Sequence, residues 1–224
     1  HFIEHGFSEG RTDSSSGGSS NLTDLEALNY VASNNDLISA FGINIEAAKS
    51  HYINHGKTEE RSLDTFDEWS YLASHGDLIS AFGTSTFSAT EHYLSNGYAE
   101  GRSLDTFDEW SYLASHEDLI TAFGSDTTAA TKHYVANGYT EGRPVDNFDE
   151  WGYLASNNDL MKAFGTNTTE AVKHYVSYGM TEGRGTNGFN AESYLNNYAD
   201  LNSNFGNDQD LALSLIHISE PTRQ

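Results

Sequence analysis

The chain has 224 residues, with 33 acidic side chains against 11 lysines and arginines, so its formal net charge is −22. It contains no cysteine, which excludes a disulfide framework, a thiolate zinc site and a cysteine nucleophile. No apolar run approaches the ~18 residues of a transmembrane helix, and phosphate backbones repel so acidic a surface. We therefore expect no membrane insertion in this segment and no binding to nucleic acid.

One unit of 41 residues repeats along the chain. Its clearest markers are Phe41, Phe82, Phe123, Phe164 and Phe205. We assign the chain, in order, to the C-terminal half of a repeat (1–11), a Ser/Gly-rich insert (12–23), repeat 1 (24–61), repeat 2 (62–102), repeat 3 (103–143), repeat 4 (144–184), a truncated repeat 5 (185–213) and a tail (214–224).

The first helix of a repeat is predicted to start at an aspartate, Asp67 in repeat 2. Aspartate is a good N-cap, and Phe66 before it can staple to Tyr71. A second helix is predicted from Ser74, with Ser74 and Asp77 as a capping box and Gly83 closing it in the left-handed conformation. The same capping role falls to Asp36, Asp118, Asp159 and Asp200.

The third helix is predicted from Ser85, whose equivalents Asn44, Asp126, Asn167 and Asp208 are also cap-forming residues. It runs through His92 and ends at Gly97, a second C-terminal glycine. Units of three short helices cannot bury their apolar faces alone, so neighbours must stack. The sequence therefore predicts an all-α fold, an elongated α-solenoid of 41-residue repeats.

A family resemblance rests on Tyr-Leu-Ala-Ser (71–74), Asp-Leu-Ile (77–79), Ala-Phe-Gly (81–83), His-Tyr (92–93) and Glu-Gly-Arg (100–102). This pattern resembles tandem repeats of roughly forty residues in large secreted or surface-exposed bacterial proteins. Some of those proteins also carry calcium-binding nonapeptide repeats, but the Gly-Gly-x-Gly-x-Asp pattern is absent here. The chain departs from its own pattern at Glu60, where other repeats have glycine.

Histidine recurs at one position of the repeat: His51, His92, His133 and His174. Packed helices lie roughly 8–10 Å apart, whereas two ligands of one zinc, with bonds near ~2.0–2.1 Å, must lie within about 4 Å. Equivalent histidines of stacked repeats therefore cannot share an ion. We interpret each histidine as a packing residue between repeats that hydrogen-bonds the backbone, and we expect no cofactor.

Outside the tail, every arginine occupies one position of the repeat: Arg11, Arg61, Arg102, Arg143 and Arg184. A guanidinium used once per unit suggests bidentate pairing with a carboxylate or with helix-end carbonyls. We interpret these residues as joints between repeats rather than as a substrate clamp. Arg102 and Arg143 are accordingly predicted to be substantially buried near a repeat boundary.

Acidic residues cluster before the first helix, as Asp64, Asp67 and Glu68 in repeat 2 and as Asp105, Asp108 and Glu109 in repeat 3. Their carboxylate density can bind Ca²⁺ weakly, although we favour a solvated acidic face.

Trp69, Trp110 and Trp151 share a position that Leu28 and Glu192 occupy elsewhere. Because glutamate is rarely buried unless paired, this position is predicted to lie at a partly open edge, where indole rings can stack on a sugar or pack against the next repeat.

The tail, residues 214–224, resembles the translation of a transposon adapter used in sequencing libraries. We expect the sequence to be a fragment assembled from short reads of environmental DNA, and we leave the tail out of the fold prediction. We further predict that it packs poorly against the array.

Two functions from different classes remain open. The first is a structural spacer of a large extracellular or cell-surface protein, a stalk, adhesin or filament segment without catalysis, whose partners are neighbouring repeats or other copies. The alternative is a multivalent module that binds a glycan or protein, with one weak site in each repeat and avidity across them.

Overall fold

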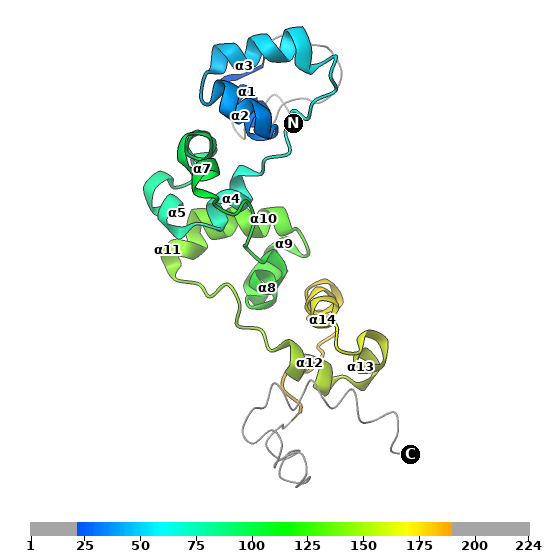
Figure 1. Ribbon diagram of the computed structural model, residues 1–224. Coiled ribbons are helices and arrows are strands. Elements are labelled where there is room, and N and C mark those ends of the chain that lie inside the picture. The colour runs from blue at the N-terminus through cyan, green and yellow to red at the C-terminus, as the bar shows by residue number, and fades with distance from the viewer. Residues whose placement is uncertain (1–21, 190–224) are drawn as a thin grey trace, which may run out of the picture. The chain divides into compact units, whose positions relative to one another are not determined.

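The computed structural model describes residues 22–189. Every regular element within that range is helical, as predicted, so the protein is all-α (Figure 1). None of these helices is long and apolar enough to cross a membrane. The predictions for residues 1–11, most of the Ser/Gly-rich insert, Asp200, Glu192, most of repeat 5 and the tail lie outside the described residues.

Each of the four repeats within the described residues contains three α-helices followed by a π-helical turn. Repeat 1 has α1 (Asp24–Ala32), α2 (Asn35–Phe41), α3 (Ile45–His51) and η2 (Tyr52–Gly56). Repeat 2 has α4 (Glu68–Ala73), α5 (Gly76–Phe82), α6 (Thr86–His92), η3 (Tyr93–Gly97) and α7 (Tyr98–Glu100). Repeat 3 has α8 (Glu109–Ala114), α9 (Glu117–Phe123), α10 (Thr127–His133), η4 (Tyr134–Gly138) and α11 (Tyr139–Glu141). Repeat 4 has α12 (Glu150–Ser156), α13 (Asn158–Phe164), α14 (Thr168–His174) and η5 (Tyr175–Gly179).

The predicted caps of the first and third helices are confirmed. Asp108 caps α8 by accepting from the Ser111 N–H at 2.9 Å. Asn44, Ser85, Asp126 and Asn167 cap the third helices in the same way. The predicted contact of the phenylalanine before the cap is also present, because the rings of Phe107 and Tyr112 lie 5.5 Å apart. These side chains bind helix N–H groups that would otherwise have no intrahelical partner.

The predicted capping box of the second helix is wrong. The helix α2 starts one residue later than expected, with Asn34 at the N-cap and no side-chain cap bond. Ser33 therefore lies outside the helix, and Asp36 lies at the second helical position instead of the third. In repeats 1, 3 and 4 the aspartate of this position, Asp36, Asp118 or Asp159, bonds an arginine side chain.

Glycines end the second helices, but not in the conformation we predicted. Gly83 has φ of 59° and ψ of −123°, which lies outside the left-handed helical region. That region is used at the end of the repeat, where Gly101 has φ of 66° and ψ of 32°. Repeat 1 has Glu60 at this position with φ of 53°. A side chain at positive φ costs roughly 1–2 kcal/mol, so Glu60 locally strains repeat 1.

The described chain forms two compact units. The first comprises residues 22–71 and 85–104. In it, α1 packs against α2 and α3 of its own repeat and against α6 and η3 of repeat 2. Leu28 and Tyr30 on α1 are fully buried, and Phe66 stacks on Tyr93 with ring centroids 4.7 Å apart. The first helix of repeat 1 thus packs on the third helix of repeat 2.

The second unit comprises residues 72–84 and 105–189. Here α8 packs against α9 and α10 of repeat 3 and against α14 and η5 of repeat 4. The Tyr175 hydroxyl donates to Glu117 Oε1 at 3.2 Å, joining the start of α9 to η5. The junction between repeats 3 and 4 therefore uses the same pair of helices as the junction between repeats 1 and 2.

Candidate functional site

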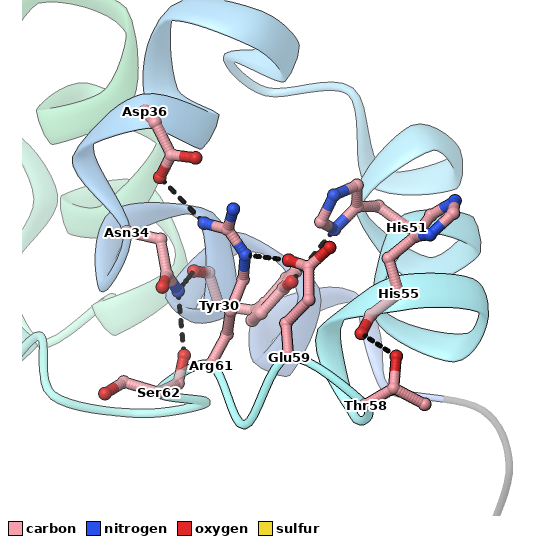
Figure 2. A network of polar contacts seen from close by, with 9 residues as sticks. All are labelled: Tyr30, Asn34, Asp36, His51, His55, Thr58, Glu59, Arg61 and Ser62. Atoms are coloured by element: carbon pink, nitrogen blue, oxygen red, sulfur yellow. Dashed lines mark hydrogen bonds and ion pairs between the residues drawn. The ribbon is translucent and has the colours of Figure 1, made fainter.

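In repeats 1, 3 and 4 the recurring tyrosine, histidine, arginine and aspartate take part in polar contacts, shown for repeat 1 in Figure 2. Tyr30 lies with its hydroxyl 2.9 Å from Nδ1 of His51. Arg61 donates from Nη1 to Asp36 at 2.8 Å and from Nε to Glu59. The network thus ties α1, α2, α3 and the end of the repeat together.

Histidine pairs with a tyrosine of its own repeat throughout the described chain. The oxygen-to-Nδ1 distances are 3.0 Å for Tyr71–His92, 3.0 Å for Tyr112–His133 and 2.8 Å for Tyr153–His174. Our prediction of a backbone partner between repeats is therefore wrong for His51, His133 and His174, each of which bonds a tyrosine of its own repeat. The first and third helices of one repeat pack together. This packing places the tyrosine hydroxyl of the first helix next to the imidazole of the third.

A helical glycine makes room for each tyrosine hydroxyl. A Cβ atom added to Gly138 would overlap Tyr112 Oη, and one added to Gly97 would overlap Tyr71 Oη. We predicted these glycines as helix ends, and that is wrong, because Gly97 has φ of −57° and the helical path continues through it. Glycine is needed here for the close approach of a side chain and not for a positive φ.

Burial and neighbouring charge fix the protonation states of this pair. Burial raises the pKa of Tyr112 to about 12, so the phenol keeps its proton. Burial, and then the positive charge of Arg143, lower the pKa of His133 below its usual value. The pKa of His174 is lowered by burial and Arg184 in the same way. At neutral pH the pair is a phenol and an uncharged imidazole, whose Nδ1 can accept a hydrogen bond from the phenolic hydroxyl.

Arginine pairs with carboxylates, as predicted, but within its own repeat. Arg143 bonds Asp118 at 2.9 Å and Glu141 at 2.7 Å, and 27% of its side chain is exposed. Arg61 and Arg184 have equivalent partners. The predicted role of these three residues as links between repeats is therefore wrong. The arginine at the end of each of these repeats lies next to the aspartate in the first turn of the second helix of the same repeat. Arg102 donates to Glu100 of repeat 2 at 2.8 Å.

Other side chains hold the segment that connects one repeat to the next. Ser115 Oγ accepts from the Asn147 N–H at 2.8 Å, and His116 Nε2 lies 2.9 Å from the Pro144 carbonyl oxygen. In repeat 1, Ser33 and Asn34 bond the connecting segment in the same way. We did not predict this clamp. Its signal in the sequence is the recurrence of asparagine or histidine, both N–H donors, at positions 34, 75, 116 and 157.

The acidic cluster of repeat 2 contributes to the junction with repeat 1. Asn29 Nδ2 donates to Glu68 Oε1 at 2.7 Å and to Asp64 Oδ1 at 3.2 Å. Thr90 Oγ1 donates to Asn29 Oδ1 at 3.1 Å, and burial raises the pKa of Glu68. Within residues 22–189, no group of three or more histidines, aspartates or glutamates is placed to hold a metal ion.

Trp69, Trp110 and Trp151 are each half-buried. Leu28 occupies the same position in repeat 1 and is fully buried. The position can therefore be closed completely by packing, and the half-buried indoles combine packing area with an accessible edge. Their recognition role stays a prediction.

Comparisons of the chain with protein-family models, with curated proteins and with solved structures find no match. In repeats 1, 3 and 4, the recurring histidine, tyrosine, arginine and aspartate are engaged with partners of their own repeat. Such an arrangement can hold backbone segments together.

The glycine contact gives a direct mutational test. Gly138→Ala should destabilise the protein by roughly 1–3 kcal/mol, as overpacking does, although alanine is favoured over glycine by about 1 kcal/mol in a helix. Gly185→Ala is the matched control, because a Cβ there meets no atom within 4 Å. Urea unfolding of the full chain measures both. Adding Tyr112→Phe to Gly138→Ala should restore part of the loss. A Gly138→Ala protein as stable as the parent would contradict the contact.

The tyrosine–histidine pair should make the protein sensitive to mild acid. Unfolded histidine titrates near ~6.5, and His133 and His174 take up the proton less readily when folded. Their contribution to stability is therefore complete above about pH 6.5 and is lost as the pH falls through the lower, folded pKa. Imidazole NMR titration should place both values below those measured in urea. The His133→Asn protein should lose less stability than the parent protein when the pH is lowered. An equal loss in both proteins would show that His133 does not cause the acid sensitivity.

Proposed function

We propose that the chain is a structural repeat array, a spacer segment of a large extracellular or cell-surface protein. The observation that carries this proposal is the recurrence of one network of Tyr, His, Arg and Asp in successive repeats. These side chains join parts of their own repeat, so their chemistry serves to define the shape of a unit. An array of such units repeats one surface, whereas catalysis needs one asymmetric pocket, and we propose no catalytic role.

The junctions support an extended arrangement. Repeats 1 and 2, and separately repeats 3 and 4, join through the first helix of one and the third helix of the next. Because one junction surface comes from the first helix and the other from the third, and each repeat has both helices, we infer that the same junction can be used again at each step, as in a solenoid. The acidity of the chain and its lack of cysteine are compatible with a long, soluble spacer outside the cell.

The alternative function is multivalent binding to a polysaccharide or protein through the tryptophan position. The partial exposure of Trp69, Trp110 and Trp151 favours it, because an accessible indole face can stack on a sugar ring. Leu28 weighs against it, since the same position is fully buried in repeat 1. Binding to a polysaccharide panel that is lost in Trp110→Ala, with stability retained, would favour this alternative over the spacer.

Small-angle X-ray scattering tests the spacer. A compact domain of this length has a radius of gyration of about 17 Å. We expect a distinctly larger value while circular dichroism remains helical, because stacked repeats extend in one direction. Measurements in added salt control for expansion by the net charge of −22. A folded chain with a radius of gyration near that of a compact domain would contradict the proposal.

A further inference from the structure

Repeat 1 carries a second histidine one helical turn after the recurring one. His51 is the last residue of α3, and His55 lies in the π-helical turn η2. Residues four apart on a helix are neighbours on its surface, and the two imidazole ring centroids lie 5.3 Å apart. The equivalents of His55 in repeats 2, 3 and 4 are Asn96, Asn137 and Tyr178. Among the four described repeats, the histidine pair is therefore specific to repeat 1.

The spacing of the two rings suits one shared metal ion. A zinc–nitrogen bond of ~2.0–2.1 Å places the ion about 3 Å from the ring centre, so two imidazoles on one tetrahedral ion have centroids about 5 Å apart. His51 and His55 match this spacing. Two histidines four residues apart on one face of a helix are also the zinc ligands of the HExxH motif. Tyr52 stands where that motif has its glutamate, so the pair has the ligands without the general base.

Tyr30 holds His51 in an orientation that leaves one ring nitrogen for a metal. Its hydroxyl lies 2.9 Å from Nδ1 of His51, as Figure 2 shows. When Nδ1 carries the ring proton, it donates to the tyrosine oxygen, and the lone pair of Nε2 is available to the ion. Proteins commonly orient a metal-binding histidine through a hydrogen bond from its other ring nitrogen. His55 is exposed, so its ring can turn to direct a nitrogen at the same ion.

The charges beside the pair favour a cation. Arg61 bonds both Asp36 and Glu59, so two carboxylates outnumber one guanidinium. The hydrogen bond from Arg61 lowers the pKa of Glu59, and the two nearby histidines lower it further, so this carboxylate lies close to both rings. Because Glu59 is engaged with Arg61, we do not count it as a ligand. The two imidazoles are then the protein ligands, and water completes the coordination shell.

The position of His55 stays open where a repeat has described neighbours on both sides. Its equivalents Asn96 and Asn137 are exposed, although repeats 2 and 3 are each preceded and followed by a described repeat. In repeat 4, the equivalent Tyr178 is 61% exposed, and its ring centroid lies 5.8 Å from that of His174. A side chain at this position is exposed in every described repeat, so stacking of the repeats leaves the pair accessible to an ion.

We propose that His51 and His55 together bind a divalent transition-metal ion, Zn²⁺, at the surface of repeat 1. The two imidazole nitrogens replace two of the water ligands of the ion, with no oxidation or reduction. Imidazole suits zinc, whereas Ca²⁺ and Mg²⁺ prefer oxygen ligands and do not compete for the pair. This metal site goes beyond the spacer function and does not depend on it.

Calorimetric titration of the full chain with Zn²⁺ tests the site, with millimolar Mg²⁺ present to occupy sites made of oxygen alone. All proteins carry His1→Asn and His5→Asn, because these two residues have the same spacing in the sequence. This background protein should bind one Zn²⁺. His55→Asn introduces the residue that repeats 2 and 3 have here, so circular dichroism should show an unchanged helix content. It should weaken Zn²⁺ binding at least about tenfold, since even losing a group that only orients a ligand costs about 10–100-fold.

A second variant should move the site to repeat 3. Asn137→His, added to the His55→Asn protein, places an imidazole one turn after His133, whose Nδ1 lies 3.0 Å from the Tyr112 hydroxyl. Binding of one Zn²⁺ should return to the affinity of the background protein.

NMR spectra of the histidine rings identify the ligands. In the background protein, Zn²⁺ should shift the ring signals of His51 and His55 and leave those of His174 unchanged. A background protein that binds no Zn²⁺, or a His55→Asn protein that binds as tightly as the background, would overturn the proposal. Shifts confined to other histidines, or no recovery with Asn137→His, would overturn it as well.

Discussion

The hydroxyl of a buried tyrosine, placed against a helical glycine and beside an imidazole, is the contact on which each repeat depends. In repeat 3, Tyr112 reaches the backbone of Gly138 and lies 3.0 Å from His133. The tyrosine comes from the first helix, while the glycine and histidine come from the third helix and its π-helical turn. Because a fully buried phenol needs a hydrogen-bonding partner, this contact fixes how the two helices pack.

The position of the tyrosine also fixes the surfaces that a repeat offers to its neighbours. With the first helix held on the third, the remaining face of the first helix meets the third helix of the next repeat, as α1 meets α6 and α8 meets α14. The arginine ion pairs close the end of the repeat at its exposed side, where such pairs are worth ~0–1 kcal/mol. The ion pairs therefore contribute little to stability beside the buried tyrosine contacts and the packing at the junctions.

The all-α fold, the three helices of each repeat and the caps Asp108, Asn44 and Ser85 follow from local sequence signals, because a cap bonds backbone only a few residues away. The predictions for Asp36, His133 and Gly97 failed for a different reason. Each of these residues has a partner outside its own helix, at Arg61, Tyr112 and Tyr71. Periodicity identifies such residues as important but does not tell which positions meet, since every recurring residue has the same period.

Amide hydrogen exchange of the full chain, followed residue by residue by NMR, tests this account most directly. If the tyrosine contact organises each repeat, the slowest amides should recur every 41 residues, on the first helices around Tyr71, Tyr112 and Tyr153 and on the third helices that hold the histidines. The exposed ends near Arg102 and Arg143 should exchange much faster. Protection without this period, or protection greatest around the arginines, would contradict the account.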